Sequence, residues 1–456
     1  MKILLVYPPF CTPASPPYSL VNLYSFLRNN SGLDLEVLDL NLKFHTLKFA
    51  EYGKYFQLFA KDFNNDNSNY DKKAKEFLQL TKQTYSKNNK KVVLGENPEL
   101  IDDLVKEIIS HKADYVAFSL VYSSQSFYSL ALLKKLKELG IKTIVGGPAV
   151  NDKIRALSHL VPNNEVELLE YLISKKLNLD KLNYDYYLDF SILPLEKYFV
   201  DQPVIPIKTS SACYYQQCAF CSHHGNQKYS EFPLENVKET IIKSGQKQFF
   251  FIDDMISKKR LLQIAEMIKP LNLIWTCQLR PTIDLDRATL KQLYDSGLRM
   301  VIWGVESGCD RVLKLMRKGT NKKDIEKVLS DAKSIGIKNV LYIMFGFPTE
   351  TKEEFLETVD FLKQNKENID LISSSIFGLQ KGSPVYADPI KYGIVKVKEE
   401  LRTVLDPKIS YSVNSGLSSA EVIKLKKEHL VELRQINNYP SSMNFFREHL
   451  LNLCEK

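Results

Sequence analysis

Long hydrophobic runs are absent from this sequence of 456 residues. Because no stretch of about 18 uncharged apolar residues occurs, we expect no membrane-spanning helix. The apolar run at the N-terminus is too short for a signal peptide, and no small-residue cleavage site follows it. We therefore expect a cytoplasmic protein with no membrane partner.

A large excess of one charge is absent as well. The net charge of +8 is modest for this length, and the lysines are spread over the whole chain. Their densest runs, at 87–91 and 424–427, are interpreted as solvated helix faces and loops rather than as a nucleic-acid-binding patch. A disulfide framework is not expected either, because the seven cysteines are odd in number and the chain is expected in the cytoplasm.

The pattern of apolar residues predicts an α/β protein of two or three units, since 456 residues exceed the usual size of one domain. Residues 1–179 alternate strand and helix patterns, which predicts a Rossmann-like, doubly wound parallel sheet. A polar stretch at about 44–91 interrupts this alternation and is predicted to be a helical insertion. The strands expected here are Ile3–Tyr7, Leu35–Leu38, Tyr115–Leu120 and Thr143–Val145.

Residues 180–202 are interpreted as a connector, and a second βα series follows at 203–392. Six βα repeats are too few for a closed eight-stranded barrel, so we predict a partial (βα)6 TIM barrel with its active site at the carboxyl ends of the strands. The last region, 393–456, is predicted to be a mainly helical C-terminal extension. The barrel strands expected are Val204–Thr209, Gln248–Ile252, Leu273–Cys277, Met300–Gly304, Val340–Phe345 and Ile369–Phe377.

Three of the cysteines, Cys213, Cys218 and Cys221, fall together in the loop that follows the first barrel strand. Close spacing lets one loop present three thiolates to a [4Fe–4S] cluster, and it leaves one iron open to a small molecule that offers an amine and a carboxylate. The alternative is a zinc site, because His223 or His224 would complete a tetrahedral Cys3His set. The cysteines alone leave both interpretations open.

Polar residues follow at the ends of later barrel strands. Asp253 and Asp254 end the second strand, where they either enter the mouth of the barrel or cap a helix. Arg280 follows the third strand and either binds a carboxylate through two hydrogen bonds or forms an ordinary salt bridge. Glu306 lies in a Gly-Val-Glu-Ser-Gly segment, where it either accepts hydrogen bonds from ribose hydroxyls or is buried in a structural turn.

A loop that ends in Cys-x-aromatic-Cys after the first strand of such a series resembles the radical S-adenosylmethionine (SAM) superfamily. The Gly-Val-Glu-Ser-Gly segment at 304–308 and Gly-Phe-Pro-Thr-Glu-Thr at 346–351 add to the resemblance, which covers 204–392 closely and 1–179 more loosely. One departure is the first cysteine gap, which is one residue longer than the usual Cys-x3-Cys-x2-Cys. The resemblance implies an enzyme in which SAM chelates the open iron. One electron from the cluster then cleaves SAM to a 5′-deoxyadenosyl radical that abstracts hydrogen from the substrate.

The resemblance also implies which residues form the site and which partners the enzyme needs. The three cysteines would hold the cluster, the carboxylates would approach the SAM amino group, and the backbone after the fifth strand would contact adenine. The expected partners are a low-potential electron donor, such as flavodoxin or ferredoxin, and a small-molecule or peptide substrate. The residues expected to bind SAM are Asp253, Asp254, Arg280, Glu306, Gly346 and Phe347.

The first region resembles the cobalamin-binding domain that is fused to many radical SAM proteins, through Pro8-Pro9, a strand ending at Asp39 and the Gly146-Gly147 turn. An Asp-x-His-x-x-Gly segment, which would supply a histidine to cobalt, is absent, as it often is in such proteins. If cobalamin binds, we expect a methyltransferase or a natural-product or peptide maturase. If the domain keeps the fold without the corrin, we expect another radical rearrangement or oxidation. A zinc-stabilised binding module without catalysis is the remaining alternative.

Overall fold

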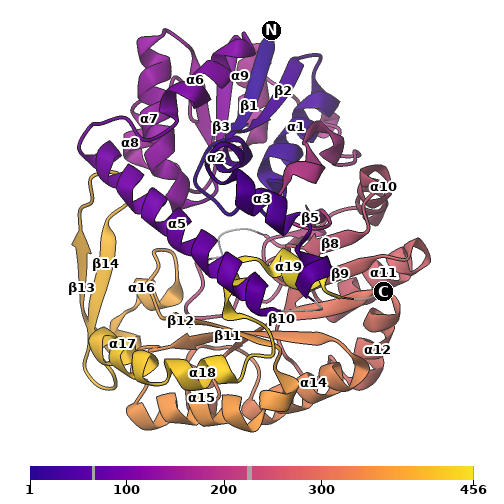
Figure 1. The fold of residues 1–456 in the computed structure, drawn as a ribbon, viewed down its shortest axis with the longest axis vertical. Coiled ribbons are helices and arrows are strands. Elements are labelled where there is room, and N and C mark those ends of the chain that lie inside the picture. Colours follow the sequence, from indigo (N-terminus) through magenta and orange to yellow (C-terminus); the bar gives the residue numbers. More distant parts are fainter. Residues whose placement is uncertain (64–66, 223–227, 455–456) are drawn as a thin grey trace. The chain divides into compact units, whose positions relative to one another are not determined.

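The computed structural model in Figure 1 describes residues 1–63, 67–222 and 228–454. The chain divides into two compact units. The first comprises Met1–Pro206, Glu235–Gln246 and Leu401–Asp406, and the second comprises Ile207–Leu234, Lys247–Glu400 and Pro407–Lys456. None of the helices in the described part of the chain combines the length and the apolar character needed to cross a bilayer.

The first unit is built on a four-stranded parallel sheet with the strand order β2-β1-β3-β4. Helices α1 and α9 pack together beside β1 and β2, and α6 and α7 pack together on the other face (Figure 1). The prediction of a Rossmann-like, doubly wound sheet is confirmed. Its strands are β1 (Lys2–Tyr7), β2 (Asp34–Asp39), β3 (Tyr115–Ser119) and β4 (Thr143–Gly146), and these helices are α1 (Tyr18–Asn30), α6 (Ile101–Ser110), α7 (Ser126–Glu138) and α9 (Glu165–Ile173).

A run of helices separates β2 from β3. The first of them begins directly after β2, where the carboxylate of Asp39 accepts the backbone N–H of Leu42 and so caps the helix. The longest carries an apolar face in which Tyr70, Ala74 and Phe77 recur at helical spacing and are buried. These helices are α2 (Leu40–Lys48), α3 (Ala50–Phe56), α4 (Phe59–Phe63) and α5 (Asn67–Val93); α8 (Asp152–Arg155) and α10 (Leu234–Ser244) occur later in the chain.

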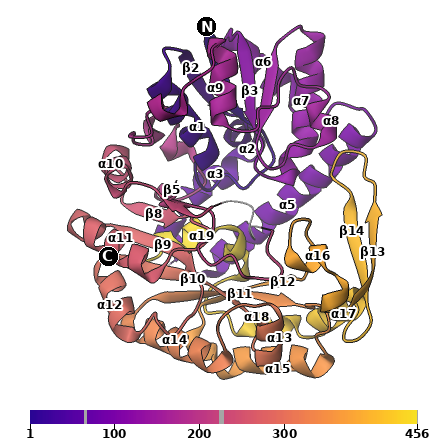
Figure 2. The same cartoon turned by 180° about the vertical axis from the view of Figure 1, so that it is seen from behind.

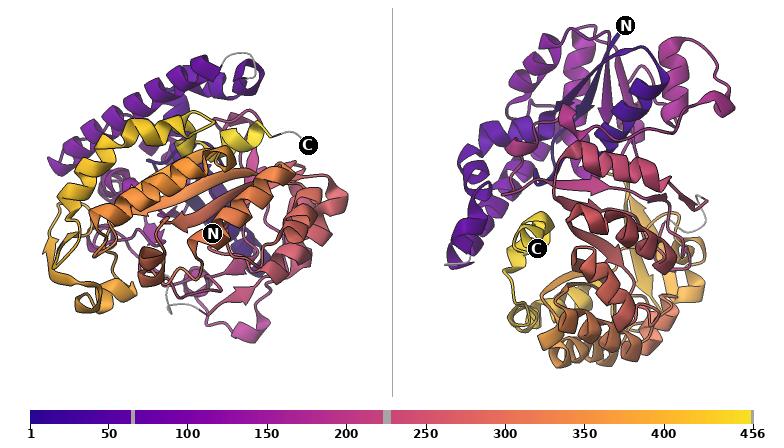
Figure 3. Two further views of the ribbon diagram at one scale, coloured as in Figure 1. Left: turned by 90° about the horizontal axis from the view of Figure 1, so that it is seen from below. Right: turned by 90° about the vertical axis from the view of Figure 1, so that its right-hand side faces the viewer.

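The second parallel sheet has six strands in the order β12-β11-β10-β9-β8-β5, which follows their order along the chain from β5 to β12. Strand β10 is buried along almost its whole length, as expected for a parallel strand covered on both faces. Figure 2 shows helices α12, α14 and α15 beneath β10 and β11, and Figure 3 shows the same helices in a row along one side of the sheet. The prediction of a partial (βα)6 barrel is confirmed.

The bounds of these elements follow the predicted order. The strands are β5 (Val204–Ile207), β8 (Gln248–Phe251), β9 (Ile274–Leu279), β10 (Leu298–Glu306), β11 (Lys338–Phe345) and β12 (Leu371–Ile376). The helices are α11 (Lys258–Ile268), α12 (Arg287–Asp295), α13 (Asp310–Leu315), α14 (Lys322–Ile335), α15 (Lys352–Gln364) and α16 (Pro384–Ala387).

The region from 393 onward departs from the prediction of a mainly helical extension. It begins with an antiparallel hairpin of β13 (Ile394–Glu400) and β14 (Lys408–Val413). Tyr411 and Val413 of this hairpin pack on the hydrophobic core that contains Phe377. The hairpin escaped prediction because β13 carries a charged run, Lys-Glu-Glu, that hides the alternation of a strand.

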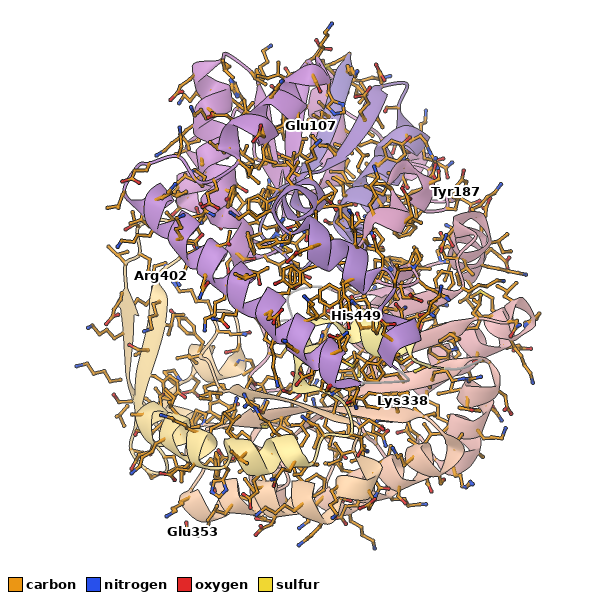
Figure 4. The ribbon with its side chains drawn as sticks, in the orientation of Figure 1. Glu107, Tyr187, Lys338, Glu353, Arg402 and His449 are labelled. Atoms are coloured by element: carbon orange, nitrogen blue, oxygen red, sulfur yellow. The ribbon has the colours of Figure 1, made fainter. Side chains whose placement is uncertain are left out.

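Helices do complete this region: α17 (Ser419–Glu428), α18 (Leu430–Gln435) and α19 (Arg447–Asn452). Hydrogen bonds hold this part to the six-stranded sheet. Lys338, which begins β11 and is labelled in Figure 4, donates to the hydroxyl of Tyr439 at 2.6 Å. The amide of Asn444 donates to the carbonyl of Ile372 in β12 at 2.8 Å. His449 of α19, also labelled in Figure 4, is buried.

Candidate functional site

The loop that carries the three cysteines runs between two short strands, β6 (Ser210–Ser211) and β7 (Ser230–Glu231), which pair with each other. Cys213, Cys218 and Cys221 are all half-buried. Among the residues that the structure describes, no three His, Cys, Asp or Glu side chains lie close enough together to hold a metal ion as they stand.

Cys218 is the most informative of the three thiols. Burial raises its pKa to about 11, while the nearby ammonium of Lys318 opposes this increase. A cation beside the thiols favours the thiolate form that binds metals. The donor set thus fits a metal cluster. The histidines of the zinc alternative, His223 and His224, lie outside the described residues.

A turn that follows α13 holds the cysteine loop from one side. The N–H of Ala219, which lies between two of the cysteines, donates to the carbonyl of Met316 at 2.9 Å. The hydroxyl of Tyr215 donates to the carbonyl of Arg317, also at 2.9 Å. The turn comes this close because Gly319 has no side chain: its φ is +69°, and a Cβ there would lie 2.2 Å from the hydroxyl oxygen of Tyr215.

Arg280, at the end of β9, joins the same loop to the same turn. Its guanidinium lies 3.5 Å above the ring of Tyr215, and its Nη1 donates to the carbonyl of Lys318 at 3.3 Å. Its Nε is buried and has no hydrogen-bond partner among the described residues. A buried donor left unpaired is costly unless a ligand completes it. Arg280 therefore fits the carboxylate-binding role expected of it.

Glu306 ends β10 and forms a buried ion pair. The Nζ of Lys318 lies 2.8 Å from its Oε1, and the two residues are only 4% and 8% exposed. Burial alone would lower the pKa of Lys318, but the neighbouring Glu306 and Cys218 raise it, so the lysine stays charged. The pair fits because residue 304 is glycine: a Cβ there would lie 2.7 Å from the Nζ of Lys318.

Asp253 has a different surrounding from the one expected. It is 2% exposed, and its carboxylate accepts hydrogen bonds from the N–H and hydroxyl of Thr209 and from the hydroxyl of Ser210 at 2.6–3.1 Å. Burial raises its pKa. It caps no helix, since Ser257 caps α11. In this structure Asp253 fixes the start of the cysteine loop, and Asp254 beside it is half-buried.

Gly346 and Phe347 follow β11 and lie in the core. Phe347 is 1% exposed, and its ring packs on Phe377 at a centroid distance of 5.3 Å. The N–H of Gly346 donates to the carboxylate of Glu350. Glu350 is buried, with one oxygen unpaired among the described residues, and burial raises its pKa to about 7.

The structure thus brings Cys218, Arg280 and Glu306 together through one residue that sequence reasoning missed, Lys318. No strand-end motif marked it, because it lies in a turn after a short helix. Its only signal is the glycine that follows it. Phe347 joins the group less directly, as a member of the hydrophobic core that also contains Ala219 of the cysteine loop.

Residues 207–362 match the family model described as the radical SAM superfamily. A Pyrococcus horikoshii protein named "uncharacterized methyltransferase PH0819" is 29% identical over 186 residues, which cover 38% of this chain and 40% of that protein. The chain thus matches less than half the length of this curated relative.

Two solved structures share the fold. The cobalamin-dependent S-adenosylmethionine radical enzyme OxsB, with aqua-cobalamin and SAM bound, has a TM-score of 0.60 and 14% identity over 99% of this chain and 71% of that one. The radical S-adenosylmethionine methyltransferase TsrM from Kitasatospora setae has a TM-score of 0.60 and 14% identity over 95% of this chain and 88% of its own. Residues 207–362, which include the three cysteines of the loop, thus match the radical SAM superfamily, and the two solved structures share the fold of the chain.

Proposed function

We propose that this enzyme cleaves SAM reductively at a [4Fe–4S] cluster held by Cys213, Cys218 and Cys221. The observation that carries the proposal is the buried ion pair of Glu306 and Lys318 beside the cysteine loop, together with the unpaired Nε of Arg280. A cluster and SAM supply one-electron cleavage of a sulfonium to a carbon radical. The ammonium of Lys318 would stabilise the negative charge of the thiolates, and Arg280 would bind a carboxylate.

The roles of these residues follow from their chemistry. Lys318 is a point charge beside Cys218, and Arg280 offers a planar donor fork suited to a carboxylate. Glu306 accepts hydrogen bonds and keeps Lys318 charged. Asp253 acts at a distance, because it fixes the backbone from which the cysteine loop departs. The paired donors and acceptors keep this edge rigid before any ligand arrives.

The first unit supports cobalamin as a further cofactor. Ligands of such sheets bind where the strands end. Here the loops after β3 and β4 approach closely, because a Cβ on Gly147 would lie 2.2 Å from the carbonyl oxygen of Leu120. The hydroxyls of Ser126 and Ser129 are buried without a partner among the described residues. A corrin supplies transfer of a methyl group, so the finer proposal is a methyltransferase that acts on a small molecule or a peptide.

The test is anaerobic purification followed by iron, sulfide and zinc analysis. We expect about four irons and four sulfides per chain, and formation of 5′-deoxyadenosine from SAM when dithionite is added. One zinc in place of iron would overturn the proposal. Reconstitution with hydroxocobalamin should leave one equivalent bound after gel filtration, and loss of all corrin there would leave a radical enzyme without methyl transfer from cobalt.

We place the enzyme in the cytoplasm, with flavodoxin or ferredoxin as its electron donor, and expect no nucleic-acid or membrane partner. A donor of low potential is required because the reaction begins with a one-electron reduction of the cluster.

A further inference from the structure

A surface pocket of the second unit adjoins two segments that hydrogen-bond to the cysteine loop. Its volume is about 340 Å³, and its lining includes Arg317, Ser383, Asp388 and Lys391. We propose that this pocket and its rim are the docking surface for an acidic electron-transfer protein of the flavodoxin or ferredoxin type, an inference that rests on the proposed function.

The path from the pocket to the cysteines is short. Ala219 lies between Cys218 and Cys221, and its N–H donates to the carbonyl of Met316 at 2.9 Å. The carbonyl of Ala219 accepts the N–H of Val385 at 3.0 Å. Met316 and Val385 each adjoin a residue that lines the pocket. One backbone hydrogen bond on either side therefore separates the pocket wall from the segment that carries the two thiols.

Two cations line the pocket and its rim. Arg317 and Lys391 are exposed, and neither forms an ion pair within the described part of the chain. Lys381, which lies nearby in sequence, is paired with Glu399. The one acid in the pocket wall is Asp388, whose carboxylate accepts the backbone N–H of Lys391 at 3.4 Å. The rim is thus positive, and it would attract an acidic partner and speed its association.

The rim of the pocket also carries an exposed apolar side chain. Ile390, next to Lys391, is 81% exposed. In the proposed interface this side chain would supply an apolar contact inside a charged rim. A small anionic substrate would need neither this side chain nor an open rim. On docking, the donor would lose one electron and the cluster would gain one.

The experiment compares two charge reversals, Arg317→Glu and Lys391→Glu, with a matched reversal, Lys259→Glu, on the exposed face of α11. Binding of flavodoxin and of ferredoxin is measured by fluorescence anisotropy at two salt concentrations. We expect Kd for the donor to rise about three- to tenfold in each rim variant and to stay at the parent value in Lys259→Glu. The parent Kd should also rise with salt, because exposed charges are screened.

Activity then separates docking from chemistry. Dithionite reduces the cluster without docking, so Lys391→Glu should form 5′-deoxyadenosine at the parent rate with dithionite and show a raised KM for flavodoxin. Parent-like donor binding in both rim variants would overturn the docking surface, and so would an equal loss of activity with both reductants. If the parent forms no 5′-deoxyadenosine with dithionite, the proposed function itself fails, whatever the donor binding.

Discussion

The two parallel sheets bury polar groups of different kinds where their strands end. At the edge of the four-stranded sheet, burial raises the pKa of Asp39 to about 6, and the hydroxyl of Tyr198 donates to its carboxyl group at 2.7 Å. Burial also lowers the pKa of His45 to about 4, so that this ring is neutral. At the edge of the six-stranded sheet, Glu306 and Lys318 remain a charged pair.

The difference concerns what each edge can do without a ligand. Asp39 and His45 have internal partners, and aromatic rings such as Phe44 surround the histidine. The other edge keeps full charges out of water and leaves the Nε of Arg280 unpaired among the described residues. Burying charge without compensation is costly. The six-stranded sheet is therefore the edge that is built for a charged ligand.

The largest effect is expected at the three cysteines that follow β5 of the six-stranded sheet. We expect Cys218→Ala to abolish both the iron cluster and the formation of 5′-deoxyadenosine. Only two cysteine thiolates would remain, so a second iron of the cluster would lack a protein ligand. The matched control is Cys454→Ala, which removes a buried thiol that donates to the carbonyl of Leu450. Iron content and product are measured on anaerobic protein. A Cys218→Ala protein with four irons would contradict the assignment.

The buried ion pair should show the next largest effect. Lys318→Met leaves the carboxylate of Glu306 buried without its partner, so we expect a loss of about 3–5 kcal/mol in the free energy of unfolding. The double variant Glu306→Gln with Lys318→Met removes both charges and should recover most of this loss. Urea unfolding is followed by tryptophan fluorescence, since both tryptophans, Trp275 and Trp303, are buried in the six-stranded sheet.

The matched change at the other edge is Tyr198→Phe. It removes one hydrogen bond to Asp39 and no charge, so we expect the free energy of unfolding to fall by about 1–2 kcal/mol. Unfolding of this variant is monitored by circular dichroism. An equal cost for Lys318→Met and Tyr198→Phe would show that the two edges do not differ in kind.

The turn that holds the cysteine loop gives a smaller effect. Gly319→Ala forces a Cβ to within 2.2 Å of the hydroxyl oxygen of Tyr215, at a φ of +69°. Gly336→Ala carries a similar backbone penalty at a φ of +101°, but its Cβ meets the ring of Tyr294 at 3.4 Å, which is tolerable. We expect a loss of about 1 kcal/mol for Gly336→Ala and about 2–3 kcal/mol for Gly319→Ala. Only Gly319→Ala should lower the iron content.

Sequence reasoning predicted both sheets because apolar strands alternating with helices leave few other topologies. It placed Glu306 and Arg280 at strand ends, since the carboxyl ends of parallel strands share one edge. It missed Lys318 and the β13–β14 hairpin for the same reason. A buried lysine and a charged strand are defined by distant partners, which no local pattern contains.

The role of Asp253 was also beyond the sequence. An aspartate at a strand end is chemically suited to a ligand and equally to a neighbouring loop. In this structure the hydroxyls of Thr209 and Ser210, more than 40 positions away in sequence, donate to the carboxylate of Asp253 and bind it to the loop. The assignment of a polar residue to a site therefore depends on long-range pairing, whereas the assignment of a strand does not.

A pH dependence tests whether the six-stranded sheet also holds a neutral buried acid. Burial raises the pKa of Glu350 from 4.5 to about 7, so the folded protein binds this proton more tightly than the unfolded chain does. Stability from this group is complete below about pH 4.5 and is lost as the pH rises through about 7. In the parent protein, the free energy of unfolding should therefore fall between pH 5 and 8. We expect this fall to be about 2 kcal/mol smaller in Glu350→Gln, as measured by urea unfolding with tryptophan fluorescence.

The matched control for this change is Glu353→Gln, in the first turn of α15, where the carboxylate is exposed and labelled in Figure 4. Hydrogen bonds lower the pKa of Glu353, the backbone bond first, so it is already ionised throughout this range, and its removal should leave the slope unchanged. A parent slope that survives in Glu350→Gln would mean that Glu350 is ionised in the folded protein. Glu350 would then add a second buried charge to the six-stranded edge, beside the pair of Glu306 and Lys318.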